Sequence, residues 1–287
     1  MASTLPRIDC RAYAKINIGL RVTEKRRDGY HEITTAFHRV ELFDDITLTA
    51  AHDVTVISTD PEVPSGESNI CHAAARMLRD HLGGSDGVRI DITKRIPPGA
   101  GLGGGSADAA AVLRSLPALW GKSVQSHELG AMALRLGSDV PYFLGDESAV
   151  GTGRGEILEF FRLDIPFAIL LCIPPVRVST AWAYARIVPR AGPVEDLRSI
   201  LVRGMTDPSI LRTHLTNDFE SPVFREYPVI RSVRDLMMEG GALFASMSGS
   251  GSSVYGLFPD AGSAAAAAGP LESRSFPTFI TPPHFRA

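Results

Sequence analysis

The stretch Pro97–Val112 reads PPGAGLGGGSADAAAV and decides how the rest of the chain is interpreted. Before it, Val88–Thr93 alternates apolar and polar side chains, which is typical of a half-buried strand. After it, Ala107–Leu113 consists mainly of strong helix formers. This order brings a flexible glycine backbone to the unpartnered N–H groups at the start of a helix. The stretch therefore predicts a phosphate-binding loop, in which Ser106 can cap the helix or contact a phosphate or its metal ion.

Two familiar glycine motifs fit this loop only in part. Three of its glycines match the dinucleotide-binding pattern, but that pattern needs an acidic residue about 20 residues later, and Leu119–Gln125 contains none. A P-loop would end in Gly-Lys-Ser/Thr, whereas Gly105–Ala107 reads Gly-Ser-Ala. A flexible surface loop without function is the remaining alternative, and the flanking strand and helix disfavour it.

Composition and charge limit the class of protein. Of the 287 residues, 44% are hydrophobic and 21% are charged, which predicts a folded core, and the net charge of −3 disfavours a general nucleic-acid binder. Cys10, Cys71 and Cys172 show no metal-binding or disulfide spacing and predict reduced thiols in a cytoplasmic protein. Met1–Asp9 lacks the apolar run of a signal peptide, and the apolar run Pro166–Pro175 is too short for a bilayer and predicts a buried strand.

A lysine and an asparagine share one face of a predicted strand at Tyr13–Leu20. Alternate apolar residues point to one side, so Lys15 and Asn17 project from the other, about 7 Å apart. A lysine on a solvated strand face usually has no role beyond solubility. Near a phosphate loop, however, it supplies a compact cation for phosphate.

Two aromatic residues leave a turn early in the chain. Asp28–Gly29 is a turn signal, and Tyr30 and His31 follow it directly. Such a pair can stack on a nucleobase and read its edge. The alternative is a tyrosine that packs on the core beside a surface histidine.

The second half of the chain contributes a further carboxylate and a short helix. Asp139 lies between a helix end at Gly137 and a proline-bounded apolar segment, so its position is constrained, although a simple turn aspartate is the alternative. Ser179 or Thr180 can cap the next short helix. On that helix Thr180 and Tyr184 would share a face, being four residues apart.

Several element boundaries are also predicted. The helix after the glycine loop is expected to stop at Pro117, and Ser126 to cap the next one. Within Gly145–Gly155, the stretch Gly151–Gly155 is predicted as a second loop, and Pro228 as a kink or break between helices. Ala242–Phe258 is predicted as a strand, a glycine-serine turn and a strand.

The pattern P-x-G-A-G-L-G-G-G-S-x-D-A-A resembles the nucleotide loop of the GHMP small-molecule kinases. Gly29–His31 and Gly137–Pro141 resemble motifs of a narrower family, the kinases that phosphorylate a cytidine-diphosphate-linked methylerythritol. Further similarity lies in Asn217–Glu220, where this chain has Phe219 in place of the family's leucine, and in the M-S-G-S-G turn after Ser246. The resemblance covers nearly the whole chain, from Tyr13 to Phe258.

The resemblance implies an α+β, two-domain GHMP-kinase fold with a ribosomal protein S5 domain 2-like N-terminal domain and a ferredoxin-like C-terminal domain. The expected domains are residues 1–155, which carry the ATP-binding glycine loop, and 156–287, with the active site in the cleft between them. The implied reaction is ATP-dependent phosphorylation of the substrate's 2-hydroxyl group in non-mevalonate isoprenoid biosynthesis. The M-S-G-S-G turn would lie against the first glycine loop and close on phosphate.

The resemblance also implies roles for individual residues, with ATP and Mg²⁺ as cofactors and no metal held by protein ligands alone. Lys15 and Asp139 are expected to be catalytic. The cytidylyl substrate is expected to bind at Asn17, Tyr30, His31, Thr180 and Tyr184, with Trp182 as a competing aromatic. The nucleotide is expected to bind at Asn69, Pro97, Pro98, Gly99, Ala100, Gly101, Leu102, Gly103, Gly104, Gly105, Ser106 and Ala107.

Other functions remain alternatives at this stage. A homoserine or mevalonate kinase would share the glycine loop but would act on an acceptor without a base. A non-catalytic nucleotide-binding protein would keep the loop and lose the chemistry, which the presence of both Lys15 and Asp139 disfavours. The expected partner is a small-molecule substrate, without nucleic acid or membrane, and the chain is expected to be a monomer or a weak homodimer.

Overall fold

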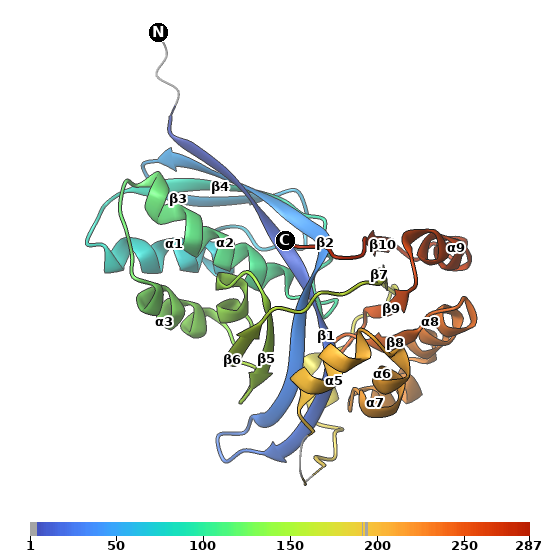
Figure 1. Ribbon diagram of the computed structural model, residues 1–287. Coiled ribbons are helices and arrows are strands. Elements are labelled where there is room, and N and C mark those ends of the chain that lie inside the picture. The colour runs from blue at the N-terminus through green and yellow to red at the C-terminus, as the bar shows by residue number, and fades with distance from the viewer. Residues whose placement is uncertain (1–4, 191, 193–194) are drawn as a thin grey trace. The chain divides into compact units, whose positions relative to one another are not determined.

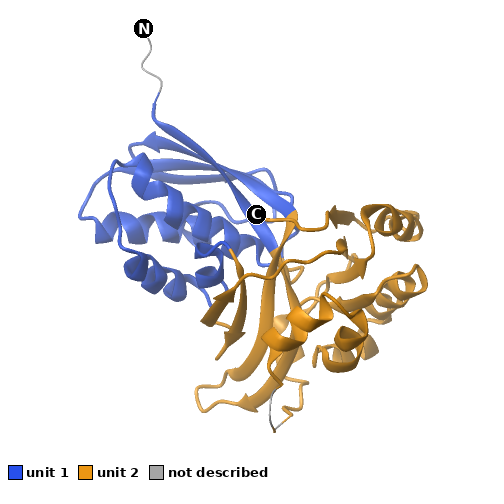
Figure 2. Ribbon diagram, viewed as in Figure 1, with its two compact units in different colours: residues 1–14, 42–98, 103–146 blue, residues 15–41, 99–102, 147–287 orange. Residues whose placement is uncertain are grey.

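The computed structural model describes residues 5–190, 192 and 195–287 and has a mixed α and β architecture (Figure 1). The chain divides into two compact units that are not consecutive in sequence (Figure 2). Unit 1 comprises the described residues of 1–14, 42–98 and 103–146, and unit 2 comprises those of 15–41, 99–102 and 147–287. The long strands β1 (Arg7–Lys25) and β2 (His31–Ala51) each contribute residues to both units.

The strands of unit 1 pair around β4 (Gly87–Thr93), which directly precedes the glycine loop. The end of β2 pairs with β4 in antiparallel fashion, and β3 (Val54–Ser58) pairs with β4 in parallel. The predicted alternation in β4 is confirmed, because Val88, Ile90 and Ile92 are buried while Arg89 and Asp91 form an ion pair of 2.9 Å. A half-buried strand therefore leads into the loop.

The α-helices described in unit 1 are α1 (Ile70–His81), α2 (Gly104–Leu119) and α3 (Ser126–Leu136). The prediction that α2 stops at Pro117 is wrong, because the helix continues to Leu119. Proline lacks an N–H donor but keeps its carbonyl, and that of Pro117 accepts a hydrogen bond of 2.9 Å from Lys122 N. The predicted cap Ser126 is already helical, and Gln125 occupies the N-cap position, where Glu128 accepts from its backbone N–H at 2.9 Å.

The strands of unit 2 form two groups. The start of β2 pairs with β5 (Ser148–Thr152), which pairs with β6 (Ile157–Phe161). The predicted loop at Gly151–Gly155 is confirmed in part, because Gly151 and Thr152 still belong to β5 while Gly153–Gly155 lie in the turn to β6, where Gly155 N donates to Thr152 O at 3.0 Å. The other group is an antiparallel sheet of order β10-β7-β9-β8, formed by β7 (Ala168–Cys172), β8 (Phe244–Met247), β9 (Val254–Phe258) and β10 (Thr278–Thr281).

The four-stranded sheet confirms two predictions. The apolar run at Pro166–Pro175 contains β7, whose five residues are all buried between β9 and β10. The predicted hairpin at Ala242–Phe258 is formed by β8 and β9. Apolar side chains from this sheet and the helices of unit 2 form one core, which places the turn between β8 and β9 at the edge of a packed sheet.

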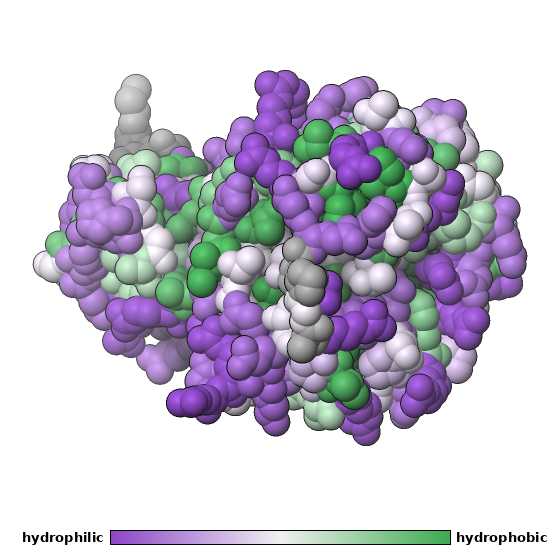
Figure 3. All heavy atoms as spheres, turned by 60° about the horizontal axis from the view of Figure 1, so that its bottom comes forward, coloured by the Kyte–Doolittle hydropathy of each residue, from purple (hydrophilic) through white to green (hydrophobic). Residues whose placement is uncertain are grey.

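The helices of unit 2 are α4 (Thr180–Tyr184), α5 (Leu197–Gly204), α6 (Pro208–His214), α7 (Glu220–Glu226), α8 (Pro228–Glu239) and α9 (Ala261–Glu272). The predicted break at Pro228 is confirmed, since α7 ends at Glu226 and α8 starts at Pro228. The space-filling view in Figure 3 shows a mostly hydrophilic face on which hydrophobic side chains gather only in small groups. Within the described ranges, no helix combines the length and apolar character needed to cross a membrane.

Candidate functional site

The first half of the glycine loop, Gly99–Leu102, belongs to unit 2. Gly99 and Gly101 adopt φ angles of +73° and +78°, which favour glycine over any residue with a side chain. A Cβ on Gly101 would lie 2.8 Å from the carbonyl oxygen of Gly251 and 2.9 Å from that of Ser248. Glycine is therefore required here both by the backbone angle and by the close approach of another chain segment.

That other segment is the turn Ser248–Ser253 between β8 and β9. The Ser253 hydroxyl donates to the carbonyl of Ala100 at 2.7 Å, and the Ser248 hydroxyl donates to that of Gly101 at 3.3 Å. The predicted contact between the M-S-G-S-G turn and the first glycine loop is therefore present. That the two segments close on a phosphate stays a prediction.

The second half of the loop belongs to unit 1 and starts α2. Gly103, at a φ of +71°, is the N-cap residue, so Ser106 lies within the first turn and is not the cap. The other role considered for Ser106, contact with a phosphate or its metal ion, stays a prediction. The N–H groups of Gly104, Gly105 and Ser106 point out of the helix start, where no intrahelical acceptor exists. The carbonyl of Gly103 accepts the first helical bond from Ala107 N at 2.9 Å. This end of α2 can bind an anion through backbone donors alone.

Pro97, Pro98 and Asn69 also lie in unit 1. Asn69 is buried and caps α1, because its Oδ1 accepts from Cys71 N at 2.7 Å and its Nδ2 donates to Pro64 O at 2.7 Å. Both polar ends of the Asn69 side chain thus serve the local fold. Its predicted role beside the nucleotide base stays a prediction.

Lys15 and Asn17 are adjacent in unit 2, as predicted from the strand alternation, but their face is buried rather than solvated. Their exposed fractions are 5% and 3%, and Lys15 Nζ donates to Asn17 Oδ1 at 2.6 Å. The Lys15 ammonium also lies 5.2 Å from the centre of the Phe37 ring. Since Lys15 N donates to Leu102 O at 3.0 Å, this strand is attached directly to the glycine loop.

Two residues missed by the sequence analysis hold Asn17. Its backbone N–H donates to the Ser248 hydroxyl at 3.1 Å, and its Nδ2 donates to Thr35 Oγ1 at 3.0 Å. Thr35 is fully buried and donates in turn to Gly19 O at 2.6 Å. Ser248 could have been found from its glycine-serine motif. Thr35 carries no sequence signal, because it sits in an ordinary strand.

Tyr30 and His31, which were predicted to serve a nucleobase together, have different neighbours in unit 2. His31 stacks on Tyr184, with ring centres 4.9 Å apart and planes 24° apart. Tyr30 remains 54% exposed, and the Arg154 guanidinium lies 4.6 Å from its ring centre. Trp182, the competing aromatic, packs its ring edge-on against Tyr227 at 5.5 Å. Of the two candidates on α4, Tyr184 is therefore the one that contacts His31.

α4 also contacts the glycine-serine turn. Ser179 caps the helix by accepting from Trp182 N at 3.3 Å, and the Thr180 hydroxyl lies 3.1 Å from that of Ser250. Burial, reinforced by the charge of Lys25, lowers the pKa of His31, which keeps its imidazole neutral near pH 7. Within unit 2, the structure thus brings the stacked aromatic pair and the phosphate-loop turn to the two ends of one short helix.

Asp139 lies in unit 1, where a helix end and a 3₁₀ helix meet. α3 ends at Leu136 with Gly137 as its C-cap, and Val140 N donates to Gly137 O at 3.2 Å. Asp139 occupies the N-cap position of the 3₁₀ helix Val140–Leu144, whose first turn contains Pro141. The backbone at Asp139 is therefore held by the turn before it and the proline after it, as the sequence predicted.

A buried charge cluster that the sequence did not predict lies where β4 runs into the glycine loop. Lys94 Nζ contacts Asp44 Oδ2 at 2.5 Å and Asp108 Oδ2 at 2.9 Å, and all three side chains are almost fully buried. Asp44 Oδ1 also accepts from the N–H groups of Arg95 and Ile96. In contrast, Asp108 Oδ1 is buried without a hydrogen-bond partner. The cluster attaches the first turns of α2 to the end of β4.

Burial, opposed by Lys94, raises the pKa of Asp108 to about 8. The ordinary pKa in an unfolded chain is about 4. Between these values the folded protein retains a proton that the unfolded chain has lost, so its stability should fall as the pH rises from 5 to 8. The slope for one proton is at most about 1.4 kcal/mol per pH unit.

We expect Asp108→Asn to reduce this dependence, because the amide has a similar shape and does not titrate. Urea unfolding of both proteins at pH 5, 6, 7 and 8 measures the difference in slope. Asp146→Asn, at an exposed aspartate that pairs with Arg114, is the control and should keep the wild-type slope. Parallel curves for wild type and Asp108→Asn would show that Asp108 is ionised throughout this range.

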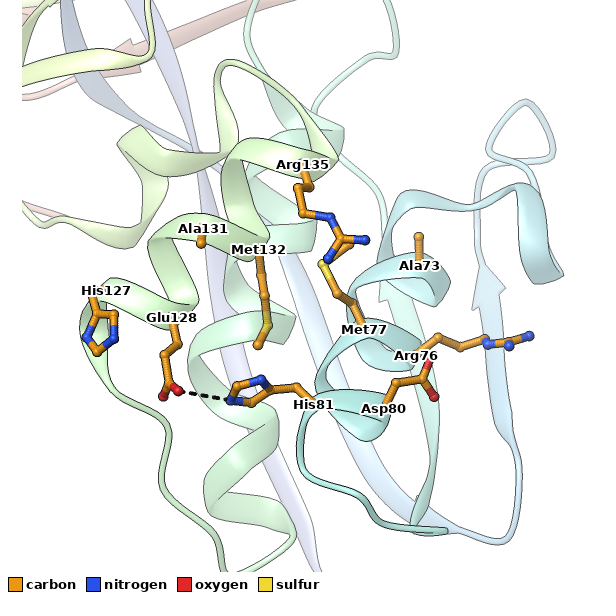
Figure 4. Close-up of a pocket in the computed structure, with 10 residues that line it drawn as sticks. All are labelled: Ala73, Arg76, Met77, Asp80, His81, His127, Glu128, Ala131, Met132 and Arg135. Carbon is orange, nitrogen blue, oxygen red and sulfur yellow. Dashed lines mark ion pairs between the residues drawn. The ribbon is translucent and has the colours of Figure 1, made fainter.

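Unit 1 also contains a cavity of about 570 Å³ between α1 and α3 (Figure 4). His81 of α1 and Glu128 of α3 form an ion pair of 3.3 Å across it, and Figure 4 shows the Arg135 side chain extending toward Met77. The described residues that line it include none of the predicted site residues. This cavity is therefore separate from the predicted nucleotide loop.

Comparisons with known proteins extend over almost the whole chain. Residues 69–146 match the N-terminal domain of GHMP kinases, and residues 197–277 match their C-terminal domain. Both matches lie on their own side of the boundary predicted near residue 155, and neither reaches it. The two-domain α+β fold predicted from the sequence is confirmed by these matches.

Individual relatives indicate which kinase family within the GHMP kinases the chain resembles. The 4-diphosphocytidyl-2-C-methyl-D-erythritol kinase of Chlorobium phaeobacteroides is 43% identical and covers 97% of this chain and 98% of its own length. The enzyme of that name from Chlorobaculum tepidum is 42% identical, with coverage of 96% and 97%. A crystal structure of 4-(cytidine 5'-diphospho)-2C-methyl-D-erythritol kinase is 35% identical, with a TM-score of 0.83 and coverage of 96% and 98%.

A more distant solved structure shares the fold alone. Homoserine kinase from Cytophaga hutchinsonii is 19% identical, with a TM-score of 0.72 and coverage of 100% of this chain and 97% of its own. The identity thus falls by almost half between the two solved structures, while the architecture is retained. On this evidence, the chain is a GHMP kinase and belongs to the family of 4-diphosphocytidyl-2-C-methyl-D-erythritol kinases.

Proposed function

We propose that this protein transfers the γ-phosphoryl group of ATP to the 2-hydroxyl group of 4-diphosphocytidyl-2-C-methyl-D-erythritol, giving the 2-phosphate and ADP. The identity of 39–43% to eight curated kinases of that name supports the reaction. The observation that carries it is the arrangement within unit 2, where His31 stacks on Tyr184 and α4 reaches the turn that packs on Gly99–Leu102. A base-binding group and a phosphate-binding backbone are thereby joined through one short helix.

For catalysis, phosphoryl transfer requires positioning and charge stabilisation rather than covalent help from the protein. The N–H groups of the glycine loop bind the ATP phosphates through the start of α2. Lys15 neutralises charge on the migrating phosphoryl group, and its burial strengthens that interaction because water does not screen it. Asp139 accepts the proton of the attacking hydroxyl group.

At the other end of the substrate, Tyr30, His31, Thr180 and Tyr184 bind the cytidine. The neutral imidazole of His31 offers one donor and one acceptor, which suits the edge of a pyrimidine base. Tyr30 has an exposed ring for stacking, and Arg154 contacts that ring. Asn17 lies next to the Lys15 ammonium and would contact the erythritol.

ATP is the co-substrate implied by the kinase family, and Mg²⁺ is part of the proposal. Magnesium in kinases takes most of its ligands from phosphates and water, with one or two from the protein. We propose that ATP supplies most of the ligands of this ion, with Ser106 near the phosphates. When bound, Mg²⁺ would neutralise charge on the β- and γ-phosphates.

An ADP-release assay with a panel of acceptors tests the proposed reaction. We expect turnover with the cytidylyl methylerythritol and none with homoserine or mevalonate. CMP and CDP should compete with the acceptor, because both present the cytosine that the aromatic residues bind. ATP consumption with homoserine or mevalonate would establish one of the alternative GHMP kinases, and its absence with every acceptor would favour a non-catalytic nucleotide-binding protein.

Tyr30→Ala should raise the KM for the cytidylyl substrate about tenfold and leave the KM for ATP unchanged. The loss of one stacked base costs about 1–3 kcal/mol, and about 1.4 kcal/mol corresponds to tenfold in affinity. Steady-state kinetics with each substrate varied in turn provides the measurement. Phe160→Ala removes another exposed aromatic of unit 2 and should change neither KM. Equal changes in both KM values for Tyr30→Ala would show that Tyr30 does not stack on the cytosine of the substrate.

Other features of the protein remain proposals as well. We propose two domains, 1–155 and 156–287, with a cytoplasmic location, which the absence of disulfides among the three cysteines supports. We also propose a monomer or weak homodimer that binds neither nucleic acid nor membranes. Size-exclusion chromatography with light scattering, at several protein concentrations, tests the oligomeric state.

A further inference from the structure

Four consecutive residues at the start of α7, Asn217–Glu220, connect both ends of the proposed substrate site within unit 2. We call this segment the NDFE segment. Asn217, Asp218 and Phe219 are buried, although they lie in a short connection between helices, where exposure is the rule. The mechanism proposed above uses none of them. Their contacts explain why a connection of this kind is buried.

Asn217 holds the turn that packs on the glycine loop. Its Nδ2 donates to the carbonyls of Met247 and Gly249 at 2.7 and 2.8 Å, and its Oδ1 accepts from Phe219 N at 3.0 Å. All the polar atoms of the side chain are therefore engaged. Between the two carbonyls lies Ser248, whose hydroxyl accepts from Asn17 N and donates to Gly101 O. The amide of Asn217 thus sets the backbone that supports the phosphate loop.

Phe219 supports the aromatic pair at the other end. Its ring is 1% exposed and meets the Tyr184 ring at 4.8 Å and an interplanar angle of 85°. This edge-to-face geometry is the favoured one for aromatic rings. Tyr184 in turn stacks on His31. The ring orientation at the cytidine end thus depends on a side chain that is too deeply buried to contact substrate itself.

Asp218 and Glu220 attach the segment to two strands. Asp218 Oδ2 accepts from Val22 N of β1 at 2.8 Å. Glu220 Oε1 accepts from the Ser246 hydroxyl and from Met247 N of β8 at 2.7 and 2.9 Å. Asp218 accepts one of these hydrogen bonds and Glu220 accepts two, so movement of the segment would break three contacts with β1 and β8. The NDFE segment is therefore a fixed element between the two contact points.

We infer that the NDFE segment positions both halves of the substrate site, with Asn217 acting on the nucleotide end and Phe219 on the cytidine end. Both are positioning residues, since they act through the Ser248 turn and through Tyr184. The inference rests on the proposed function. It predicts that each substitution affects one substrate and not the other, which a purely structural role of the segment would not produce.

Phe219→Leu retains an apolar side chain and removes the aromatic edge. An edge-to-face pair is worth about 0.5–1.5 kcal/mol, so we expect the KM for the cytidylyl substrate to rise about two- to tenfold while the KM for ATP stays unchanged. Phe224→Leu is the matched control, because Phe224 lies on α7, packs on the same core and contacts Arg234 rather than Tyr184. The control should leave both KM values at the wild-type level.

Asn217→Ala is expected to show the opposite pattern. It leaves two carbonyls of the turn without their donor, so the KM for ATP should rise about tenfold while the KM for the cytidylyl substrate changes little. Asn217→Ser retains a small polar side chain and gives the same test if the alanine variant does not fold. Calorimetric binding of ADP and of CDP to each variant checks the assignment without turnover.

The outcomes separate this inference from the proposed function. If the wild type is active but Phe219→Leu and Asn217→Ala each change both KM values equally, or change neither, the positioning roles are overturned. The proposed function is unaffected by that result. A wild-type protein that neither phosphorylates the cytidylyl substrate nor binds CDP overturns the proposed function. Selective loss of CDP binding in Phe219→Leu, and of ADP binding in Asn217→Ala, supports the inference.

Discussion

Replacement of Lys15 by methionine is expected to lower kcat about 10²–10³-fold and to change the KM for ATP by less than threefold, within the usual range for a lost electrostatic contact. The exposed fraction of Lys15 is only 5%, so water screens its charge little and the charge acts strongly on the migrating phosphoryl group. Methionine has nearly the same length and volume and lacks only the charge and the donors. The variant therefore separates electrostatics from packing.

Two measurements support the interpretation of this variant. Lys122→Met removes a lysine that pairs with Asp86 in unit 1, far along the chain, and should retain wild-type kcat. Thermal unfolding should show that Lys15→Met is folded, since methionine retains the packing of the buried side chain. A folded Lys15→Met enzyme with near-normal kcat would remove Lys15 from the catalytic residues.

The parts of the site that the sequence predicted are those that local chemistry determines. The glycine loop lies between β4 and α2 as expected, because strand alternation, glycine freedom and alanine-rich helix formation all act over a few residues. The position of Asp139 was likewise predictable from Gly137 and Pro141 on either side. The cap by Ser179 follows the same rule.

The parts that the sequence did not predict depend on residues far apart in the chain. Asn17 meets Thr35 and Ser248, and Lys94 meets Asp44 and Asp108, through strand pairing and packing that no local pattern encodes. Such packing also buried the face of β1 that was expected to be solvated. These buried polar side chains carry no periodicity that distinguishes them from surface residues before the fold is known.

The aromatic residues show a third case, in which the residues were identified but their pairing was not. Tyr30 precedes β2, whereas His31 is its first residue, and the two side chains contact different neighbours. His31 stacks on Tyr184, and the Tyr30 ring contacts the Arg154 guanidinium. Tyr184 and Arg154 lie far from this turn in the sequence, so these neighbours could be identified only from the fold.

Asp139→Asn is expected to lower kcat about 10²–10⁴-fold, which is the usual loss on removal of a general base. The amide fits the same backbone position and cannot accept a proton, so ADP binding measured by calorimetry should remain at the wild-type level. Asp146→Asn, at an exposed aspartate of the same unit, is the control and should retain full activity. Turnover near the wild-type level in Asp139→Asn would exclude Asp139 as the base.

The double variant Lys15→Met/Asp139→Asn then tests whether the two residues serve one chemical step. Residues that act as a unit give losses that are far from additive, because once one is removed the other has little left to stabilise. We therefore expect the double variant to lose about as much kcat as the more damaging single variant. Losses that multiply would instead mean that lysine and aspartate lower the barrier independently, and Asp139 would have a proton-accepting role that does not require the cation.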